Sequence, residues 1–459
     1  MSKSGGGGDN PGPGPDPPSP PPPIIPEHYN PYKVDPSDVS SGTTAFSALM
    51  KAPTKYNPRL HSLALDRINP VLKDGEKKLS INTRDIPEGP NNLFTPNVRM
   101  SVDMIKWRLA HLTLTDDTKA RYSIPEQAVK KPVGDDTMRL DMLGFHYSHD
   151  PFFISFNDTR NKSNWFLSTF NQSLVFMDKF IQMDFLLPSQ RLFGLGERVH
   201  DFQLDEGTWT MWAVGLDSPY DDGTGRKGVY GVHPFVLVQT AQKNDYIGIF
   251  FRNSNAQSPV IKYNADGTSV LSYITIGGQL EVYFFIHGTA KDIIAQYHQV
   301  FGKPNLPPFW SLGWQQASWK YINRQMVESV IDQYSQNQMP LETVYLDIPY
   351  MKKYADFTVD EAAFPKLYEL ADRLHSANQR LVLIIDAAIS AEDASVNNTY
   401  FTMGQKDGIF IKSSMYKSDA YNNTLIAKVW PEVAVFVDWW NPKCLNMWAT
   451  GLKDLYAQV

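Results

Sequence analysis

Two aspartates and two tryptophans lie at or near the ends of short apolar stretches of the sequence. Asp347 follows the stretch ETVYL, Asp386 follows RLVLII, Trp319 follows SLGWQQAS, and Trp430 lies in the segment VWPE. Carboxylates accept hydrogen bonds from sugar hydroxyls, and the face of a tryptophan packs on the apolar side of a pyranose ring. These residue types, if they are brought together, would bind a carbohydrate.

Two other uses of the carboxylates are open. Aspartate often caps the turn that follows a strand, and paired carboxylates can bind a metal ion. Zinc would need histidine or cysteine ligands beside Asp347 and Asp386, but His375 falls in a predicted helix. Magnesium or calcium would accept carboxylates alone, yet these loops show no further ligand spacing. Two aspartates on consecutive strands, with tryptophans nearby, favour sugar binding, and we predict no metal site.

Strands and helices alternate in the part of the chain that carries these residues. Apolar stretches predict strands, and apolar residues at helical spacing predict helices, as at Met326, Val330 and Tyr334. Such alternation predicts a parallel sheet with crossover helices. The predicted elements are strand 311–318, helix 323–338, strand 342–348, helix 363–379, strand 380–390 and helix 442–459.

These elements form three β/α units, fewer than half of those that close a (β/α)8 barrel. Barrels of this kind carry their chemistry at the carboxyl ends of the strands. The first predicted strand ends near Trp319, the second at Asp347 and the third at Asp386. We therefore expect these three side chains to converge on one rim.

The preceding part of the chain has a different pattern of residues. Short stretches rich in Val, Ile, Phe, Tyr and Thr alternate with Asn, Asp and Gly turns over residues 61–302, which predicts an antiparallel β-sandwich. Residues 1–60 are Gly/Pro-rich and then polar, which predicts a disordered linker or a segment that binds a partner groove. The predicted fold class is multidomain: this linker, the sandwich, and a partial TIM barrel over 303–459 with an insertion at about 391–430.

Composition excludes several kinds of partner. The 459-residue chain has a net charge of −6, so the basic surface that nucleic acid requires is not expected. Cys444 is the only cysteine, so an intrachain disulfide is impossible. The longest apolar runs, such as residues 381–385, are far shorter than the roughly 20 residues that cross a bilayer.

Several motifs occur in an order that resembles glycoside hydrolase family 31, the α-glucosidase family. They are RLFGLGER (191–198), SPYDDGTG (218–225), GVYGVHPF (228–235), YHQVFGKPNLPPFWSLGWQQ (297–316), YLDIPYMKKYADFT (345–358), LVLIIDAAIS (381–390) and VWPEVAVFVDWWNP (429–442). The resemblance implies a galactose mutarotase-like sandwich followed by a catalytic barrel. It also implies hydrolysis of terminal α-linked glucose in oligosaccharides by a retaining mechanism with two aspartates and no cofactor.

The resemblance assigns substrate-binding positions to six residues of this chain. They match the family's L-D-I-D-Y-M, I-x-D-P-A-I-S, V-W-P-G and R-W-G-Y motifs and are Asp347, Ile348, Ile384, Asp386, Trp430 and Trp319. The family's nucleophile lies in a segment resembling D-G-x-W-x-D-M-N-E, which this chain does not contain. The nucleophile and the acid/base would therefore lie beyond Val459, and we expect the chain alone to be inactive.

The chain departs from the family's motifs at several positions, and this leaves a second interpretation open. The departures are Ser318 for Arg, Lys320 for Gly, Pro349 for Asp, Ala387 for Pro, Glu432 for Gly and Val437 for Pro. In a loop of the sandwich, Trp212–Gly215 and Asp217 stand where the family often has W-N-x-D. These differences are also compatible with a non-catalytic carbohydrate-binding protein or a degenerate paralogue.

Potential glycosylation sites bear on location. Asn-x-Ser/Thr sequences, the acceptors of N-linked glycans, occur at Asn157, Asn161, Asn171, Asn397 and Asn422. The N-terminus contains no apolar signal core. The acceptor sites and the family resemblance together favour the secretory pathway or a lysosome-like compartment.

Overall fold

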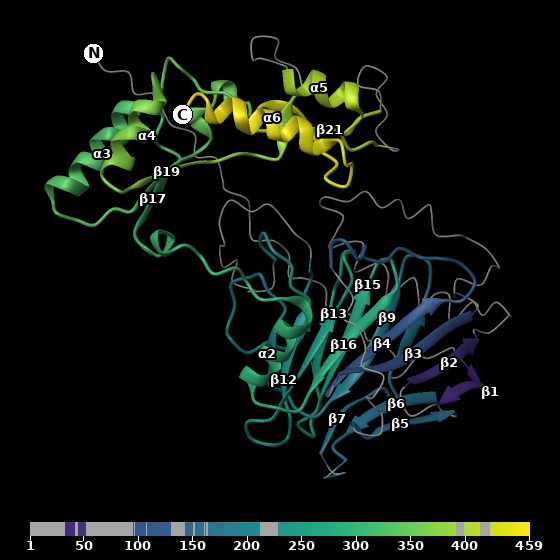
Figure 1. Cartoon of the computed structure of the whole chain (residues 1–459). Helices are drawn as coiled ribbons and strands as arrows, with labels where there is room; N and C mark the ends of the chain where they lie inside the picture. The colour runs from purple at the N-terminus through teal and green to yellow at the C-terminus, as the bar shows by residue number, and fades with distance from the viewer. Residues whose placement is uncertain are drawn as a thin grey trace, which may run out of the picture. The chain divides into compact units, whose positions relative to one another are not determined.

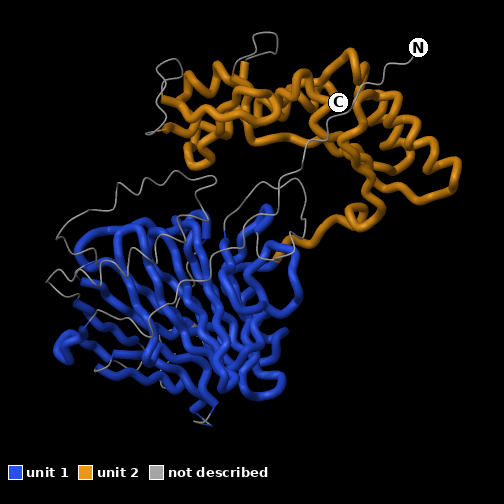
Figure 2. The backbone as a smooth tube through the Cα atoms, turned by 180° about the vertical axis from the view of Figure 1, so that it is seen from behind, with its two compact units in different colours: residues 1–303 blue, residues 304–459 orange. Residues whose placement is uncertain are grey.

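A computed structural model describes most of the chain. The described residues are 33–41, 45–51, 95, 97–106, 108–129, 143–149, 152–159, 161, 164–211, 228–391, 399–413 and 423–459. They fall into two compact units, residues 1–303 and 304–459, which are coloured separately in Figure 2. Figure 1 labels the elements of each unit.

The first unit contains two antiparallel sheets. Among the described residues, the first sheet has eight strands in the order β1-β2-β3-β4-β16-β13-β12-β10. In that order their bounds are Lys33–Ser41, Ala45–Lys51, Asn97–Lys106, Leu109–Asp116, Leu280–Ile286, Tyr246–Phe251, Phe235–Gln239 and Leu192–Gly194.

The second sheet follows the order β11-β14-β15-β9-β7-β6-β5, and β8 also pairs with β9. In that order, with β8 last, the bounds are Gly207–Thr208, Val260–Tyr263, Ser269–Thr275, Ile181–Leu187, Trp165–Ser168, Phe152–Asn157, Phe145–His149 and Leu174–Phe176.

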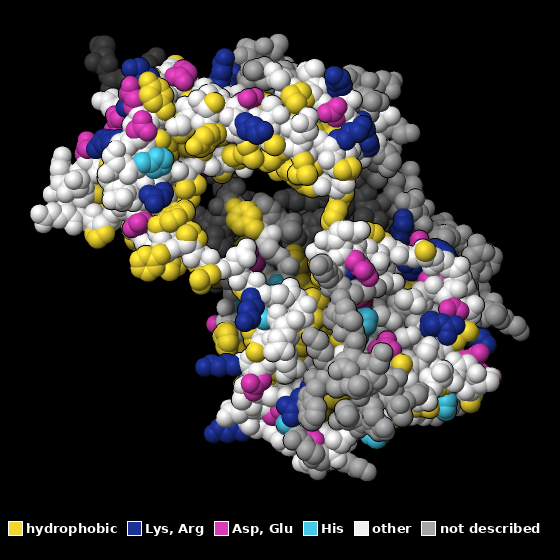
Figure 3. Space-filling model, in the orientation of Figure 1, with side chains coloured by type: hydrophobic (Ala, Val, Ile, Leu, Met, Phe, Trp, Pro, Cys, Tyr) yellow, Lys and Arg dark blue, Asp and Glu magenta, His cyan; other side chains and the backbone are white. Residues whose placement is uncertain are grey.

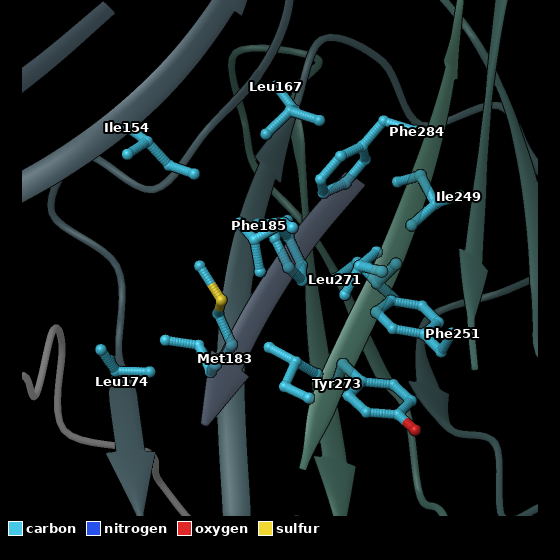
Figure 4. Packing of buried hydrophobic residues seen from close by; sticks show 14 of the residues in the cluster. Ile154, Leu167, Leu174, Met183, Phe185, Ile249, Phe251, Leu271, Tyr273 and Phe284 are labelled. Carbon is cyan, nitrogen blue, oxygen red and sulfur yellow. The ribbon is translucent and has the colours of Figure 1, made fainter. Parts of the chain in front are cut away.

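Aromatic residues from both sheets form one core between them. Phe185 of β9 lies 5.8 Å from Phe284 of β16 and 6.1 Å from Phe251 of β13, measured between ring centroids. Phe251 in turn stacks on Tyr273 of β15 at 3.8 Å (Figure 4). Each of these side chains is fully buried. Because the inward residues of the two sheets interdigitate in this way, the predicted β-sandwich is confirmed.

The sandwich begins earlier in the sequence than predicted. The linker prediction for residues 1–60 is wrong for residues 33–41 and 45–51, which form β1 and β2 at the edge of the first sheet. In β2, Phe46, Ala48 and Met50 alternate with partly exposed residues, so this strand is buried on one face. Residues 1–32 lie outside the described part of the chain.

Helix α2 (Ala290–Phe301) packs on the outer face of the first sheet. Thr289 caps its first turn by accepting a hydrogen bond from the backbone N–H of Asp292, whose side chain accepts one from the N–H of Thr289. Ile293 is buried against this sheet, and the ring of Phe301 lies 4.7 Å from that of Phe250. The helix thus covers a second, smaller apolar cluster in the same unit.

The second unit is built around three parallel strands. These are β17 (Gln315–Ser318), β18 (Thr343–Leu346) and β19 (Arg380–Leu383), and β18 lies between the other two. The helical elements around them are η3 (Phe309–Leu312), α3 (Arg324–Gln336), η4 (Ile348–Tyr350), η5 (Lys352–Tyr354), α4 (Leu367–Ser376) and α6 (Cys444–Tyr456).

Helices α3 and α4 provide the crossovers between these strands. Val327 and Ile331 of α3 and Leu370 and Leu374 of α4 are buried in the same cluster as Val344 of β18. Apolar positions three or four residues apart place these side chains on the buried face of each helix. The unit therefore has the strand order and crossovers predicted for the start of a (β/α)8 barrel.

The third predicted strand is divided between two sheets. The prediction of one strand over 380–390 is wrong, because β19 ends at Leu383 and residues 388–390 form β20 in a separate antiparallel sheet. That sheet has the order β20-β22-β21, with β21 at Ile426–Val429 and β22 at Glu432–Phe436, and α5 spans Thr399–Asp407. Helix α5 and strand β21 fall within the region predicted as an insertion, about 391–430, whereas β20 and β22 flank it.

Two features bear on location. Among the residues described, no helix is long and apolar enough to cross a membrane. Asn157 is buried and its Oδ1 lies 2.9 Å from His146 Nε2, whereas Asn161 and Asn171 are exposed and accessible to a glycan. Asn397 and Asn422 lie outside the described residues.

Candidate functional site

The three barrel strands end at the same level. Ser318, Leu346 and Leu383 are register partners at the carboxyl ends of β17, β18 and β19. Trp319 and Asp347 follow directly, and Asp386 follows three residues after β19. Because the strands are parallel and in register, these residues leave the sheet at one edge.

Asp347 caps a short helix immediately after β18. Its Oδ1 accepts a hydrogen bond from the backbone N–H of Ile348 at 2.8 Å, and η4 begins there. Pro349 occupies the first turn of η4, where a missing N–H leaves no hydrogen bond unmade. The capping role considered from the sequence is therefore present, and the Asp347 side chain remains partly exposed at the rim.

The two isoleucines predicted to bind substrate lie in or against the core. Ile348 is 3% exposed and belongs to the cluster of the barrel strands, and Ile384 is partly buried against the same cluster. The backbone N–H of Ile384 donates to the carbonyl of Leu346 at 3.1 Å. In this structure both residues fix the rim, and a direct contact with substrate stays a prediction.

The two predicted tryptophans come together at the surface of the second unit. Trp319 follows β17 and Trp430 lies in the turn between β21 and β22, yet their ring centroids are 5.1 Å apart at an interplanar angle of 39°. The ring of Tyr354, which sequence reasoning missed, lies 6.1 Å from that of Trp319. Trp319 is 41% exposed and Trp430 50%, so part of this aromatic surface is accessible to solvent. Figure 3 shows that hydrophobic side chains are common on the surface of this unit.

A third aspartate, Asp356, lies behind the rim and was also missed. The backbone N–H of Asp386 donates to Asp356 Oδ1 at 2.9 Å, and Asp356 is only 4% exposed. Burial raises the pKa of Asp386, and the nearby charge of Asp347 raises it further. Asp356 does not follow an apolar strand, which is how the other aspartates were found. The one feature of the sequence that could have indicated its burial is the core residue Phe357 directly after it.

Other functional groups can be placed only in part. In the described ranges no group of three or more His, Cys, Asp and Glu side chains is arranged to hold a metal ion. The sandwich loop with Trp212–Gly215 and Asp217 lies outside the described residues.

The fold and the rim residues define a sandwich-plus-barrel protein whose candidate site lies at the carboxyl ends of the barrel strands. The family model described as "Glycosyl hydrolases family 31 TIM-barrel domain" matches residues 304–459. The model described as "Glycosyl hydrolase 31 N-terminal galactose mutarotase-like domain" matches residues 88–257. The two matches together cover more than half of the chain, which belongs to glycoside hydrolase family 31.

Curated relatives agree with this assignment. The chain is 30% identical over 403 residues to intestinal sucrase-isomaltase of Suncus murinus, covering 87% of this chain and 21% of that protein. It is 30% identical over 353 residues to lysosomal alpha-glucosidase of Mus musculus, covering 76% of this chain and 35% of that protein. The chain thus spans about a fifth to about a third of the length of these relatives.

Solved structures agree on the fold. One is a chain of the ER glucosidase II complex, which consists of the catalytic subunit and the binding domain of the regulatory subunit. This chain superposes on it with a TM-score of 0.70 at 18% sequence identity, and the match covers 91% of this chain and 49% of that chain. Another is a GH31 dextranase from Flavobacterium johnsoniae, complexed with isomaltotriose. Its TM-score is 0.64 at 15% sequence identity, and the match covers 94% of this chain and 46% of that chain. The predicted fold class, a mutarotase-like sandwich followed by part of a TIM barrel, is therefore confirmed.

Proposed function

We propose that the complete protein is an α-glucosidase-like hydrolase that cleaves terminal α-linked glucose, and that this chain supplies part of its sugar-binding site. The observation that carries the proposal is the alignment of Trp319, Asp347 and Asp386 at one edge of three parallel strands, with the ring of Trp430 packed beside that of Trp319. The names of the curated relatives, a sucrase-isomaltase and a lysosomal alpha-glucosidase, support an α-glucoside as the substrate.

In this proposal the rim residues bind and orient the sugar. The Asp347 and Asp386 carboxylates accept hydrogen bonds from its hydroxyls, which are stronger than bonds between neutral groups. The aromatic surface of Trp319 and Trp430 packs on the apolar face of a ring. Such contacts fix the glycosidic bond relative to the reacting groups, which lowers the entropic part of the barrier.

In this proposal the chemical step belongs to a segment resembling D-G-x-W-x-D-M-N-E, which these 459 residues do not contain. A retaining glycosidase needs two carboxyl groups about 5–5.5 Å apart across the scissile bond, one acting as nucleophile and the other as acid and base. Asp347 is engaged in capping η4, and Asp386 is attached by its backbone to Asp356. Because both match binding positions in the family's motifs, we give these two aspartates binding roles, and no cofactor enters the proposed mechanism.

The proposal predicts that the 459-residue chain does not hydrolyse 4-nitrophenyl α-glucoside. The measurement is release of 4-nitrophenol by the purified chain, compared with buffer and with the Asp347→Ala variant. No release above buffer agrees with a binding role. Clear turnover that disappears in Asp347→Ala would show that the catalytic pair is present in this chain.

A second candidate is a non-catalytic carbohydrate-binding paralogue. It is favoured by Ser318, which stands where the family motif has arginine and whose hydroxyl accepts a hydrogen bond from the N–H of Lys320. Serine cannot provide the fork of donors with which arginine holds neighbouring carboxylates. For this candidate, the chain extended beyond Val459 would bind maltose without cleaving it.

A further inference from the structure

We propose that Asp356 is a positioning residue of the candidate sugar site, whose uncharged carboxyl holds the backbone of Asp386 and limits the negative charge at the rim. The inference rests on the proposed function, because Asp386 belongs to the same site. Asp356 would act through Asp386 and not by touching the sugar.

Two hydrogen bonds join the segment after β18 to the segment after β19. The hydroxyl of Tyr350 donates to the carbonyl of Ile384 at 2.8 Å, and the backbone N–H of Asp386 donates to Asp356 Oδ1 at 2.9 Å. Residues 384–386 lie beyond the end of β19, and the N–H of Ile384 still donates to the carbonyl of Leu346. Two residues further on, the backbone N–H of Asp386 is held by Asp356, which helps to place Asp386 at the rim.

Asp356 is itself held firmly by the residue that follows it. Phe357 is buried, and its ring lies 4.9 Å from that of Tyr400 and 5.0 Å from that of Trp448. This packing ties the loop to α5 and α6. A rigid support of this kind is what a positioning residue requires.

The second oxygen of Asp356 favours an uncharged carboxyl. Oδ2 is buried and has no hydrogen-bond partner among the described residues. An ionised carboxylate with an unpaired oxygen is costly in such a place, whereas a protonated one is tolerated. Burial raises the pKa of Asp356 to about 8, the N–H of Asp386 acts in the opposite direction, and the charge of Asp386 raises it again.

The titratable groups whose charges raise the pKa values of Asp356 and Asp386 are other carboxylates. The charge of Asp386 acts on Asp356, and that of Asp347 acts on Asp386. Burial and the charges of Asp356 and Asp386 raise the pKa of Tyr350, which stays a neutral donor. Lys352 lies in the same loop, on its exposed side. Ionisation of Asp356 would therefore place a further negative charge beside Asp386.

The direction of the pH effect follows from this arrangement. Asp356 is uncharged below its pKa of about 8 and ionises as the pH rises through that value. At higher pH the carboxyl of Asp356 becomes charged, and the rim geometry that depends on its uncharged form is lost. Because the folded pKa lies above the ordinary value of 3.8, the folded protein loses stability as the pH rises from about 4 to about 8.

The test is the pH dependence of maltose binding by the chain, followed by tryptophan fluorescence. If only the uncharged form positions Asp386, affinity is constant up to about pH 7 and roughly tenfold weaker at about pH 9. Asp356→Asn keeps an uncharged acceptor for the N–H of Asp386, so its affinity should not fall over this range. Asp360→Asn, a change in the same loop, should keep the wild-type profile.

The outcomes separate this inference from the proposed function. If Asp356→Asn loses affinity at high pH as the wild type does, the role of Asp356 is overturned while the sugar site stands. If the folded wild type binds no maltose at any pH, the proposed function fails and the positioning role fails with it.

A measurement without sugar tests the same carboxyl. The free energy of unfolding of the wild type in urea should decline from about pH 4 to about pH 8 relative to that of Asp356→Asn. In Asp386→Asn this decline should end at a lower pH, because the charge that raises the pKa of Asp356 is gone. Parallel profiles for the wild type and Asp356→Asn would overturn the proposal.

Discussion

At the scale of single residues, the rim shows how one side chain serves both structure and binding. Asp347 directly follows β18, caps η4 and still lies partly exposed at the strand ends. Pro349 stands where the family motif has a second aspartate, and it fits the first turn of η4 without loss of a hydrogen bond. The backbone of this turn therefore accommodates the departure, which removes a carboxylate from the rim.

Glu432 gives a prediction about another departure. The family motif has glycine here, and Glu432 has φ = 66°, a left-handed conformation that glycine adopts without strain. Glu432→Gly should raise the free energy of unfolding by about 0.5–1 kcal/mol, measured by urea denaturation. The exposed Lys428–Glu432 ion pair is lost as well, but such pairs contribute little.

Glu432→Ala is the matched control for this change. It removes the same ion pair but keeps a Cβ atom in the left-handed region, so it should not be stabilising. If Glu432→Gly were less stable than Glu432→Ala, strain at this turn would be excluded as the explanation.

At the scale of elements, alternation of strands and helices predicted the barrel unit well. Apolar spacing located α3, α4 and α6 and the strands β17 and β18 to within a few residues. Apolar spacing failed where long-range strand pairing decides which sheet a segment joins. The stretch 380–390 is mainly apolar on both sides of Asp386, and only the pairing of residues 388–390 with β22 shows that the chain leaves the barrel sheet after Leu383. The strand β2 has a period-2 pattern that could have been recognised, but it follows a Pro-rich segment.

The packing of α6 gives a prediction at this scale. A Cβ atom on Gly451 would lie 2.5 Å from the ring of Phe357, so the helix approaches this ring closely only because residue 451 has no side chain. Gly451→Ala should lower the free energy of unfolding by about 1–3 kcal/mol, although alanine favours a helix by about 1 kcal/mol.

A double-mutant cycle tests this reason. Phe357→Leu makes room beside residue 451, so the Gly451→Ala change should cost less in that background than in the wild type. If the two changes are additive in urea denaturation, overpacking against Phe357 is not the cause.

At the scale of the whole molecule, the sequence predicted the two kinds of domain and most of the rim, but not its internal contacts. Strand order predicts that Trp319, Asp347 and Asp386 share an edge. It does not predict that the ring of Trp430, from the added sheet, packs beside that of Trp319, because that contact depends on how the β21–β22 turn folds back. Asp356 was missed for a similar reason, since its burial comes from long-range packing of Phe357.

The central claim is that this chain carries sugar-binding residues of a family 31 α-glucosidase, and calorimetric titration with maltose tests it most directly. Loss of a hydrogen bond to a charged group costs about 1.5–3 kcal/mol, so Asp347→Ala should weaken saturable binding by roughly tenfold or more. Asp372→Ala, which changes an exposed aspartate of α4, should leave binding unchanged. Saturable binding of maltose that is roughly tenfold or more weaker in Asp347→Ala is the predicted result. Absence of binding by the folded chain, or equal binding by Asp347→Ala, would contradict the account.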